Sequence, residues 1–193
     1  MDGLYTVLAA VISAAATLSS VWLARKMMHR TKRDAIVDET IQNANVYTAL
    51  EFLLGEVNGD RAYVMEFHNG DHYFSGRGQQ KFSCTYEIVE KGISAEFRNS
   101  QNHRISNFHH YINELVNDGS FKYQSIEEVP DQAFKTLLKD KGVRAIFNVP
   151  LKTLNGKVIG ILGVDYVRSS PELDEKMLQF MKRQARIVAG YLL

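Results

Sequence analysis

Residues 144–166 read RAIFNVPLKTLNGKVIGILGVDY, and this stretch decides the fold. Two apolar runs, residues 143–152 and 157–167, lie on either side of Asn155 and Gly156. An Asn-Gly pair favours the positive φ angles that a tight hairpin turn requires. The two runs are therefore predicted to pair as antiparallel strands of one sheet.

Helices are predicted on both sides of this hairpin. Upstream, Asp131 is placed to cap a helix that runs through Leu138, and Gly142 ends it. Downstream, residues 172–193 repeat apolar side chains at helical spacing, which predicts an amphipathic terminal helix. Its apolar positions are Leu173, Met177, Phe180, Met181 and Ile187.

The preceding half of the chain begins with a long helix. Apolar residues from Ile36 to Val57 fall largely at helical spacing, and the turn residues Asn58, Gly59 and Asp60 end the run. The next predicted element is a strand over residues 61–67, which alternates apolar and polar side chains. The polar residues 68–71 are predicted to form the loop that ends this strand.

A second alternating strand is predicted over residues 81–89. Its period of two places Phe82, Cys84, Tyr86 and Ile88 on one face. From residue 96 to residue 124 loops and short helices are expected. Helices at both ends of an antiparallel sheet define an α+β domain, and no internal repeat interrupts it.

Composition limits the chain to one ordinary domain with a short appendage. It has 193 residues, 45% of them hydrophobic, and a formal net charge of +1. This balanced charge predicts no nucleic-acid partner, because such binding needs concentrated lysine and arginine. The lone cysteine, Cys84, cannot form an intramolecular disulfide, so the domain needs no oxidising compartment.

The N-terminal segment predicts a single membrane span. Residues 4–24 carry no charge and, as a helix, are just long enough to cross a hydrocarbon core of roughly 30 Å. A cleaved signal peptide would begin with cations, whereas here the cations follow the apolar run. These five are Arg25, Lys26, Arg30, Lys32 and Arg33. They predict a single-pass protein of the inner (cytoplasmic) membrane with its soluble domain in the cytoplasm.

Three regions follow: a transmembrane helix over 1–24, a basic collar and juxtamembrane helix over 25–59, and a soluble domain over 60–193 whose first helix starts near 40. Small residues recur at four-residue spacing in the span, including Ala9, Ser13 and Thr17. Such spacing permits close helix packing, although it is also common by chance. Besides the lipid bilayer, the expected partner is a second copy, bound through the transmembrane and terminal helices.

The hairpin resembles the most recognisable part of GAF domains. A strand ending in Val-Pro-Leu, a glycine turn and the pattern V-I-G-x-L carry the resemblance, which extends over residues 40–193. Related PAS-like sheets contain similar hairpins. The resemblance implies a GAF/PAS-like antiparallel sheet flanked by helices, which binds a small molecule beneath its covering helices or acts as a dimerising relay.

The resemblance also implies the residues of a ligand pocket. Those matching its wall are Phe82, Cys84 and Tyr86, and those near its rim are Phe108, His109, Tyr111, Phe147 and Asp165. The aromatic members have a plainer interpretation, because any sheet buries such side chains in its core.

Chemistry beyond binding finds no support in the sequence. Glu66, His68, Asp71 and His72 lack metal-ligand spacing, so no metal site is predicted. Adjacent His109 and His110 are expected on a solvated loop. Cys84 is expected to be a buried, inert thiol and not a bilin attachment point. No Walker, nucleophile-elbow, dinucleotide or cyclic-nucleotide signature occurs, and we expect neither a cofactor nor enzymatic activity.

Three functions remain open. The first is a membrane-tethered signalling module that responds to a small-molecule ligand or a protein partner. The second is a holin-like or other phage membrane protein that oligomerises in the inner membrane. The layout of tail, span and domain resembles the T holins of T-even bacteriophages, and so does the stretch Gln184-Ala185-Arg186-Ile187. Those holins carry their domain in the periplasm, whereas the basic collar here predicts a cytoplasmic one. The third is a multimerising scaffold.

Overall fold

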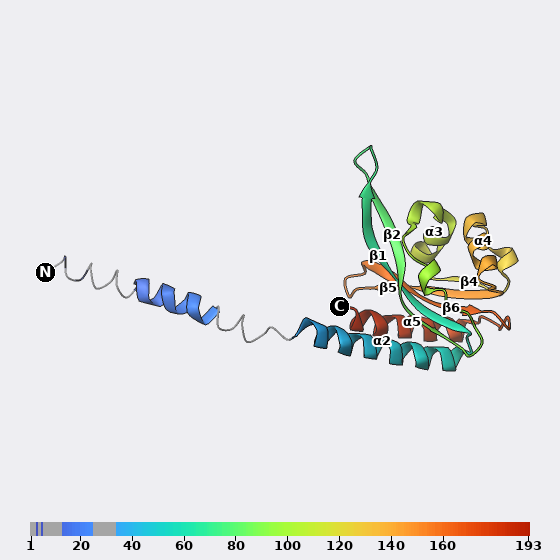
Figure 1. The fold of residues 1–193 in the computed structure, drawn as a ribbon, viewed down its shortest axis with the longest axis horizontal. Coiled ribbons are helices and arrows are strands. Elements are labelled where there is room, and N and C mark those ends of the chain that lie inside the picture. The colour runs from blue at the N-terminus through green and yellow to red at the C-terminus, as the bar shows by residue number, and fades with distance from the viewer. Residues whose placement is uncertain (1–2, 4, 6–12, 25–33) are drawn as a thin grey trace. The chain divides into compact units, whose positions relative to one another are not determined.

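A computed structural model describes residues 3, 5, 13–24 and 34–193 (Figure 1). Residues 13–24 are helical with exposed side chains. The rest of the predicted span, apart from residues 3 and 5, lies outside the described residues, as do Arg25, Lys26, Arg30, Lys32 and Arg33. Within the described ranges, no helix combines the length and the apolar character that a membrane crossing requires. The chain divides into two compact units, Met1–Ile41 and Gln42–Leu193.

The second unit is an α+β domain, as predicted, and it contains one six-stranded sheet. Its helices are α2 (Ala35–Val57), which begins before the unit boundary, α3 (His109–Asn117), α4 (Gln132–Asp140) and α5 (Glu175–Tyr191). Its strands are β1 (Arg61–His72), β2 (Gly78–Val89), β3 (His103–Arg104), β4 (Phe121–Tyr123), β5 (Ala145–Lys152) and β6 (Val158–Tyr166). The strand order is β3-β2-β1-β6-β5-β4, and all the strand pairs are antiparallel.

The predicted hairpin is confirmed. β5 and β6 pair along their length, with Phe147 opposite Val164, and Gly156 in the turn has φ +83°. The predicted caps are also present. The Asp131 carboxylate accepts the amide of Phe134 at 3.1 Å, and Gly142 has φ +68° just after α4. These features were predictable because turns and caps depend on neighbouring residues.

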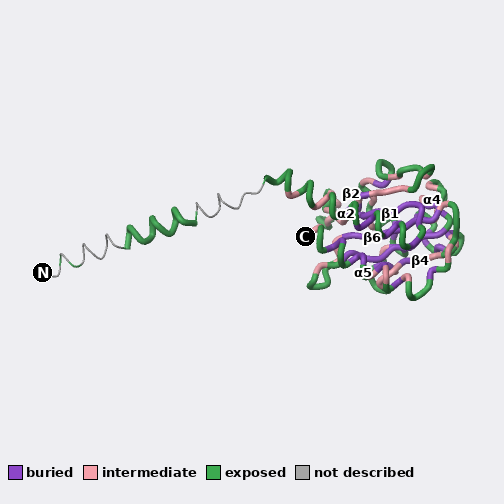
Figure 2. Tube along the Cα trace, turned by 90° about the horizontal axis from the view of Figure 1, so that it is seen from below, coloured by how far each residue is buried: buried purple, intermediate pink, exposed green. Residues whose placement is uncertain are grey.

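The sheet has an apolar core on each face. On one face α2 and α5 pack against the strands, and we call this the α2/α5 core (Figure 1). On the other face lie α3 and α4, which form the α3/α4 core with the same strands. Alternation along β1 illustrates the division, because Val64 belongs to the first core and Tyr63 to the second. Figure 2 shows that buried stretches concentrate in the strands.

Two predicted loops are regular structure instead. β1 does not end before His68 but runs to His72, because Asn69 pairs with Gln80 and His72 with Gly78 in a long β1–β2 arm. Residues 66–72 and 78–81 of this arm are intermediate or exposed and none is buried, so the arm shows no alternation between a buried and an exposed face. His109 and His110 are exposed, as predicted, but they begin α3 instead of lying on a loop, with ring centroids 5.3 Å apart.

The predicted shared face of β2 was also wrong. A β-bulge interrupts its pairing with β1: Val64 lies opposite Tyr86 and Met65 opposite Cys84, so Thr85 has no partner across the strand pair. One extra residue reverses every later side chain. Cys84 therefore belongs to the α3/α4 core and Tyr86 to the α2/α5 core. The Tyr86 hydroxyl donates a hydrogen bond to Asn43 of α2 at 2.6 Å.

Candidate functional site

The α3/α4 core gathers most of the predicted pocket residues. Phe82, Cys84, Phe108 and Tyr111 are buried in it. Asp165 lies on the same face, within hydrogen-bond distance of Tyr63. Three predicted residues lie elsewhere: Tyr86 and Phe147 are buried in the α2/α5 core, and His109 is exposed. The predicted pocket is therefore divided by the sheet.

Aromatic rings occupy the space between the sheet and the two covering helices. Tyr111 of α3 stacks on Phe134 of α4 with centroids 3.9 Å apart. The Phe82 ring of β2 lies 5.8 Å from Phe108 and 5.4 Å from His103. Such packed rings supply much of the burial in a small core. A ligand on this face would have to displace some of them.

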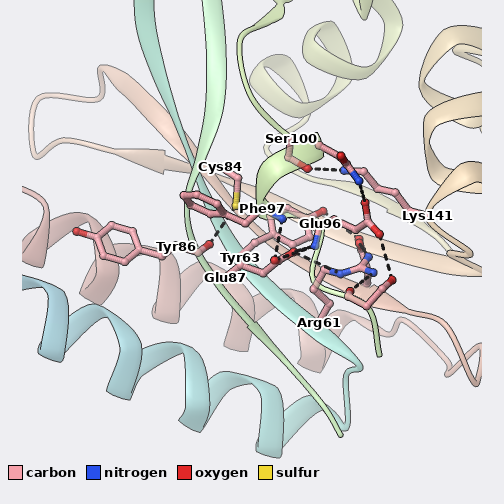
Figure 3. Close-up of polar contacts among 12 residues, drawn as sticks. Arg61, Tyr63, Cys84, Tyr86, Glu87, Glu96, Phe97, Ser100 and Lys141 are labelled. Atoms are coloured by element: carbon pink, nitrogen blue, oxygen red, sulfur yellow. Dashed lines mark hydrogen bonds and ion pairs between the residues drawn. The ribbon is translucent and has the colours of Figure 1, made fainter. Parts of the chain in front are cut away.

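Beneath these rings, β1, β2 and β6 bring a buried ion-pair cluster together (Figure 3). Arg61 is 1% exposed, and its Nη1 donates to Asp165 Oδ2 at 2.7 Å. Its Nη2 donates to the carbonyl of Ser94 at 2.9 Å, and its Nε lies 3.4 Å from Glu87 Oε1. Burial alone lowers the pKa of a guanidinium, but the charges of Asp165 and Glu87 outweigh it and raise the pKa of Arg61.

Glu87 links this cluster to the segment after β2. Its carboxylate accepts backbone hydrogen bonds from Glu96 at 3.0 and 2.9 Å and from Phe97 at 2.9 Å. Burial nevertheless raises the pKa of Glu87 above its usual value, and those two amides and Arg61 only oppose the shift. Glu87 therefore ties a loop to the buried arginine.

A chain of hydrogen bonds leads from Asp165 to α3. The Tyr63 hydroxyl lies 3.0 Å from Asp165 Oδ1 and 2.9 Å from Asn148 Oδ1, and Asn148 Nδ2 donates to the Tyr111 hydroxyl at 2.8 Å. One tyrosine proton can serve only one of two oxygens at a time, so these bonds are coupled. Burial raises the pKa of Tyr63 and of Tyr111, which keeps both hydroxyls protonated. A contact with a ligand at Tyr111 would thus reach the ion-pair cluster.

A polar rim borders the aromatic rings. Lys141 Nζ donates to Ser100 Oγ at 2.6 Å, and burial lowers the pKa of this lysine although Asp165 opposes the shift. His103 Nε2 is buried and has no hydrogen-bond partner among the described residues. Burial and the charge of Lys141 lower the pKa of His103, so its imidazole is neutral at pH 7. An unpartnered buried nitrogen is a group that a bound molecule could satisfy.

Cys84 is buried, as predicted. It is 2% exposed, and its Sγ donates to the carbonyl of Tyr86 at 3.3 Å. Burial raises the pKa of the thiol to about 12, with Glu87 adding to the shift. Since the thiolate is the reactive form, this cysteine is poorly suited to nucleophilic attack or covalent attachment in this state.

Several residues of the site escaped sequence analysis. Arg61 carried a weak signal, because it is a cation at the start of an apolar strand. Asn148 is likewise a lone amide inside the apolar run of β5. Glu87 looked like the polar side of an alternating strand, and nothing near Lys141 in the sequence marks it. No group of three or more His, Cys, Asp or Glu side chains in the described ranges could hold a metal ion.

No family model matches the sequence, and no curated protein matches it. Solved structures do match. The blue-light-absorbing form of the PixJ GAF domain from Thermosynechococcus elongatus superposes with a TM-score of 0.64 at 17% identity, covering 83% of this chain and 89% of that one.

Two further structures are similar. The GAF domain region of a protein from Geobacter sulfurreducens PCA has a TM-score of 0.62 at 12% identity, covering 83% of this chain and 98% of that one. A far-red-absorbing dark state with bound biliverdin IXα has a TM-score of 0.57 at 12% identity, covering 74% and 84%. At such identities the likeness concerns the fold. The fold of residues 42–193 is therefore that of GAF domains.

Proposed function

We propose that this chain is a membrane-tethered sensory module that binds a small molecule in its α3/α4 core and has no enzymatic activity of its own. The observation that carries the proposal is the coupled chain Asp165–Tyr63–Asn148–Tyr111, which ends beneath stacked aromatic rings on one face of a GAF fold. A similar structure with bound biliverdin supports the ligand class of a flat molecule with an apolar body.

Binding in this core would require Tyr111 and Phe134 to separate. The ligand's apolar body would replace their stacking, and a polar group on it would pair with His103 Nε2, which has no partner among the described residues. Movement of Tyr111 would break its bond with Asn148 Nδ2 and leave the Asn148 side chain held by Tyr63 alone, which would shift the balance between the two bonds of the Tyr63 hydroxyl. Ligand binding would thus alter the hydrogen bonds between side chains of β1, β5 and β6, and α2 and α5 pack against the other face of the same sheet.

Ligand binding is expected to raise the melting temperature of the full chain. A thermal-shift screen of flat, polar-edged small molecules, with biliverdin IXα included, should find a compound that stabilises the domain by about 2.7 kcal/mol at a hundred times its Kd. For a domain of this size that corresponds to roughly 5–10 °C. His103→Leu should abolish the shift, whereas His72→Leu, in the exposed arm, should retain it. A shift that survives His103→Leu, or no shift from any compound, would contradict the proposal.

The tether in this proposal is the uncharged segment of residues 4–24, and the five cations after it keep the domain in the cytoplasm. The domain should therefore resist protease added to intact spheroplasts and be digested once the membrane is permeabilised. Digestion in intact spheroplasts would reverse the topology. In that case the holin-like alternative would gain weight over the sensory one.

The other sequence predictions remain predictions. Of the holin-like quartet, Gln184 and Ala185 are buried, whereas Arg186 and Ile187 are exposed. The outer surface of α2 and α5 exposes Phe52 and Ile187, at 52% and 41%, which supports homo-oligomerisation through these helices. A scaffold without a ligand would use the same surface.

A further inference from the structure

The β5–β6 turn lies at the same end of the domain as the C-terminal part of α5 (Figure 1). Residues of both elements line a groove. Its volume is about 540 Å³, within the range of roughly 300–1,000 Å³ that small-ligand sites occupy. It shares no residue with the polar chain or the aromatic rings of the α3/α4 core. The residues that line it come from α5 and Leu193 after it, from β5 and its turn to β6, and from the loop before β4.

Small residues account for the hollow. Ala185, Ala189 and Gly190 present almost no side chain along one side of α5. Gly119 and Gly156 do the same on the facing loops, and the Lys182 ammonium lies near Gly119, where a Cβ would be 3.9 Å from it. The floor is thus apolar and is formed by α5, by the loop before β4 and by the β5–β6 turn.

The charge of the groove has one sign. Lys152, Lys182 and Arg186 line it, and no aspartate or glutamate does. None of the three cations forms an ion pair or a side-chain hydrogen bond with any residue in the described part of the chain. Lys182 and Arg186 are one turn apart on α5, so both heads can reach one anion.

We propose that this groove binds an anionic amphiphile, a molecule with a phosphate or carboxylate head and an apolar chain. Lys182 and Arg186 bind the head, because unpaired cations attract an anion and both can donate hydrogen bonds to its oxygens. The alanine and glycine floor receives the chain, and the exposed side chains of Leu154 and Leu193 extend the apolar wall on either side. The head belongs either to a free amphiphile or to a lipid of a bilayer.

The test uses a fluorescent reporter in the groove. Gln179 is exposed and lines the groove, so Gln179→Cys can carry a solvatochromic maleimide dye. The buried Cys84 thiol, with its pKa raised to about 12, does not compete for the label. The full chain is held in phosphatidylcholine nanodiscs, which leave both sides accessible, and is titrated with octyl phosphate, octanol and inorganic phosphate.

Octyl phosphate is expected to shift the emission saturably, with affinity at least tenfold above that of octanol or inorganic phosphate. The variant Lys182→Gln/Arg186→Gln should lose at least tenfold in affinity. Arg98→Gln/Lys176→Gln removes two exposed cations away from the groove and should change nothing. A shift in nanodiscs with added phosphatidylglycerol, absent in Lys182→Gln/Arg186→Gln, would place the head in a bilayer lipid. Two results would overturn the proposal. One is binding of octanol with the same affinity as octyl phosphate, and the other is no response to either octyl phosphate or phosphatidylglycerol.

Discussion

Asp165→Asn is expected to lower the free energy of unfolding by about 3 kcal/mol, because removing one partner leaves a buried charge uncompensated. Arg61 is 1% exposed and donates to Asp165 at 2.7 Å. Glu87, at 3.4 Å from Arg61 Nε, would remain and keep the loss near the lower end of the usual range. Urea unfolding followed by far-UV circular dichroism measures it. The one tryptophan, Trp22, lies outside the unit Gln42–Leu193 and cannot report on it.

A double-mutant cycle separates the pair from its surroundings. In Arg61→Met/Asp165→Asn no buried arginine is left unpaired, so the two changes should couple by about 2 kcal/mol. The control pair is Lys139 with Glu127, which has a similar distance of 2.8 Å but side chains 48% and 65% exposed. Glu127→Gln should therefore have little effect. If the losses in unfolding free energy from the two single substitutions simply add in the double mutant, the Arg61–Asp165 pair has no coupling energy.

Gly163→Ala is expected to cost about 3 kcal/mol, the upper part of the range for overpacking a core. A Cβ at this position would overlap the Tyr63 ring and Asn148 Oδ1. Neither neighbour can move freely, since Tyr63 is bound to both Asn148 and Asp165. The same unfolding measurement gives the loss, and near-UV circular dichroism should report the displaced tyrosine.

Gly55→Ala provides the matched control. Gly55 lies in α2 with nothing within 4 Å of its Cβ position, so alanine meets no obstacle there. Alanine should stabilise this helix by about 0.5–1 kcal/mol, since glycine loses more freedom on folding. If both substitutions were stabilising, the close packing of Tyr63 over Gly163 would be wrong.

Asp165→Asn and Gly163→Ala affect the same structural feature, the packing of the Tyr63 side chain over β6. Gly163 leaves room for the ring, and Asp165 two residues later accepts from its hydroxyl. Asn148 then continues the connection to Tyr111 of α3. In the proposed function this connection carries a change at the covering helices to the sheet. Variants that destabilise it should also weaken the response to a ligand.

Local sequence features predicted the elements of this fold well. The Asn-Gly turn, the Asp131 cap and the apolar spacing of α2 and α5 each depend on residues a few positions apart. The order of helices, strands and hairpin could therefore be read without a structure. The α+β class followed from that order, and the GAF-like fold was implied by the resemblance of residues 144–166 to GAF domains.

The site could be predicted only in part. Phe82, Cys84, Phe108, Tyr111 and Asp165 do lie on the α3/α4 face of the sheet. The bulge at Thr85 separated Tyr86 from them, because one unpaired residue reverses the alternation and leaves no mark in the sequence. The long β1–β2 arm was missed because it buries neither face, so its sequence does not alternate between apolar and polar residues.

By itself, then, the sequence determined most of the segments that become helices and strands, because helical spacing, strand alternation, turns and caps depend on short-range geometry. Only the tertiary structure decided the meeting of Arg61 with Asp165, which is 104 positions away, and of Asn148 with Tyr111. The tertiary structure also decided that aromatic side chains fill the α3/α4 core and that the cations of α5 in the groove have no ion-pair partner among the described residues. Buried polar pairs and grooves arise where distant elements pack together, and packing partners are not encoded in local periodicity.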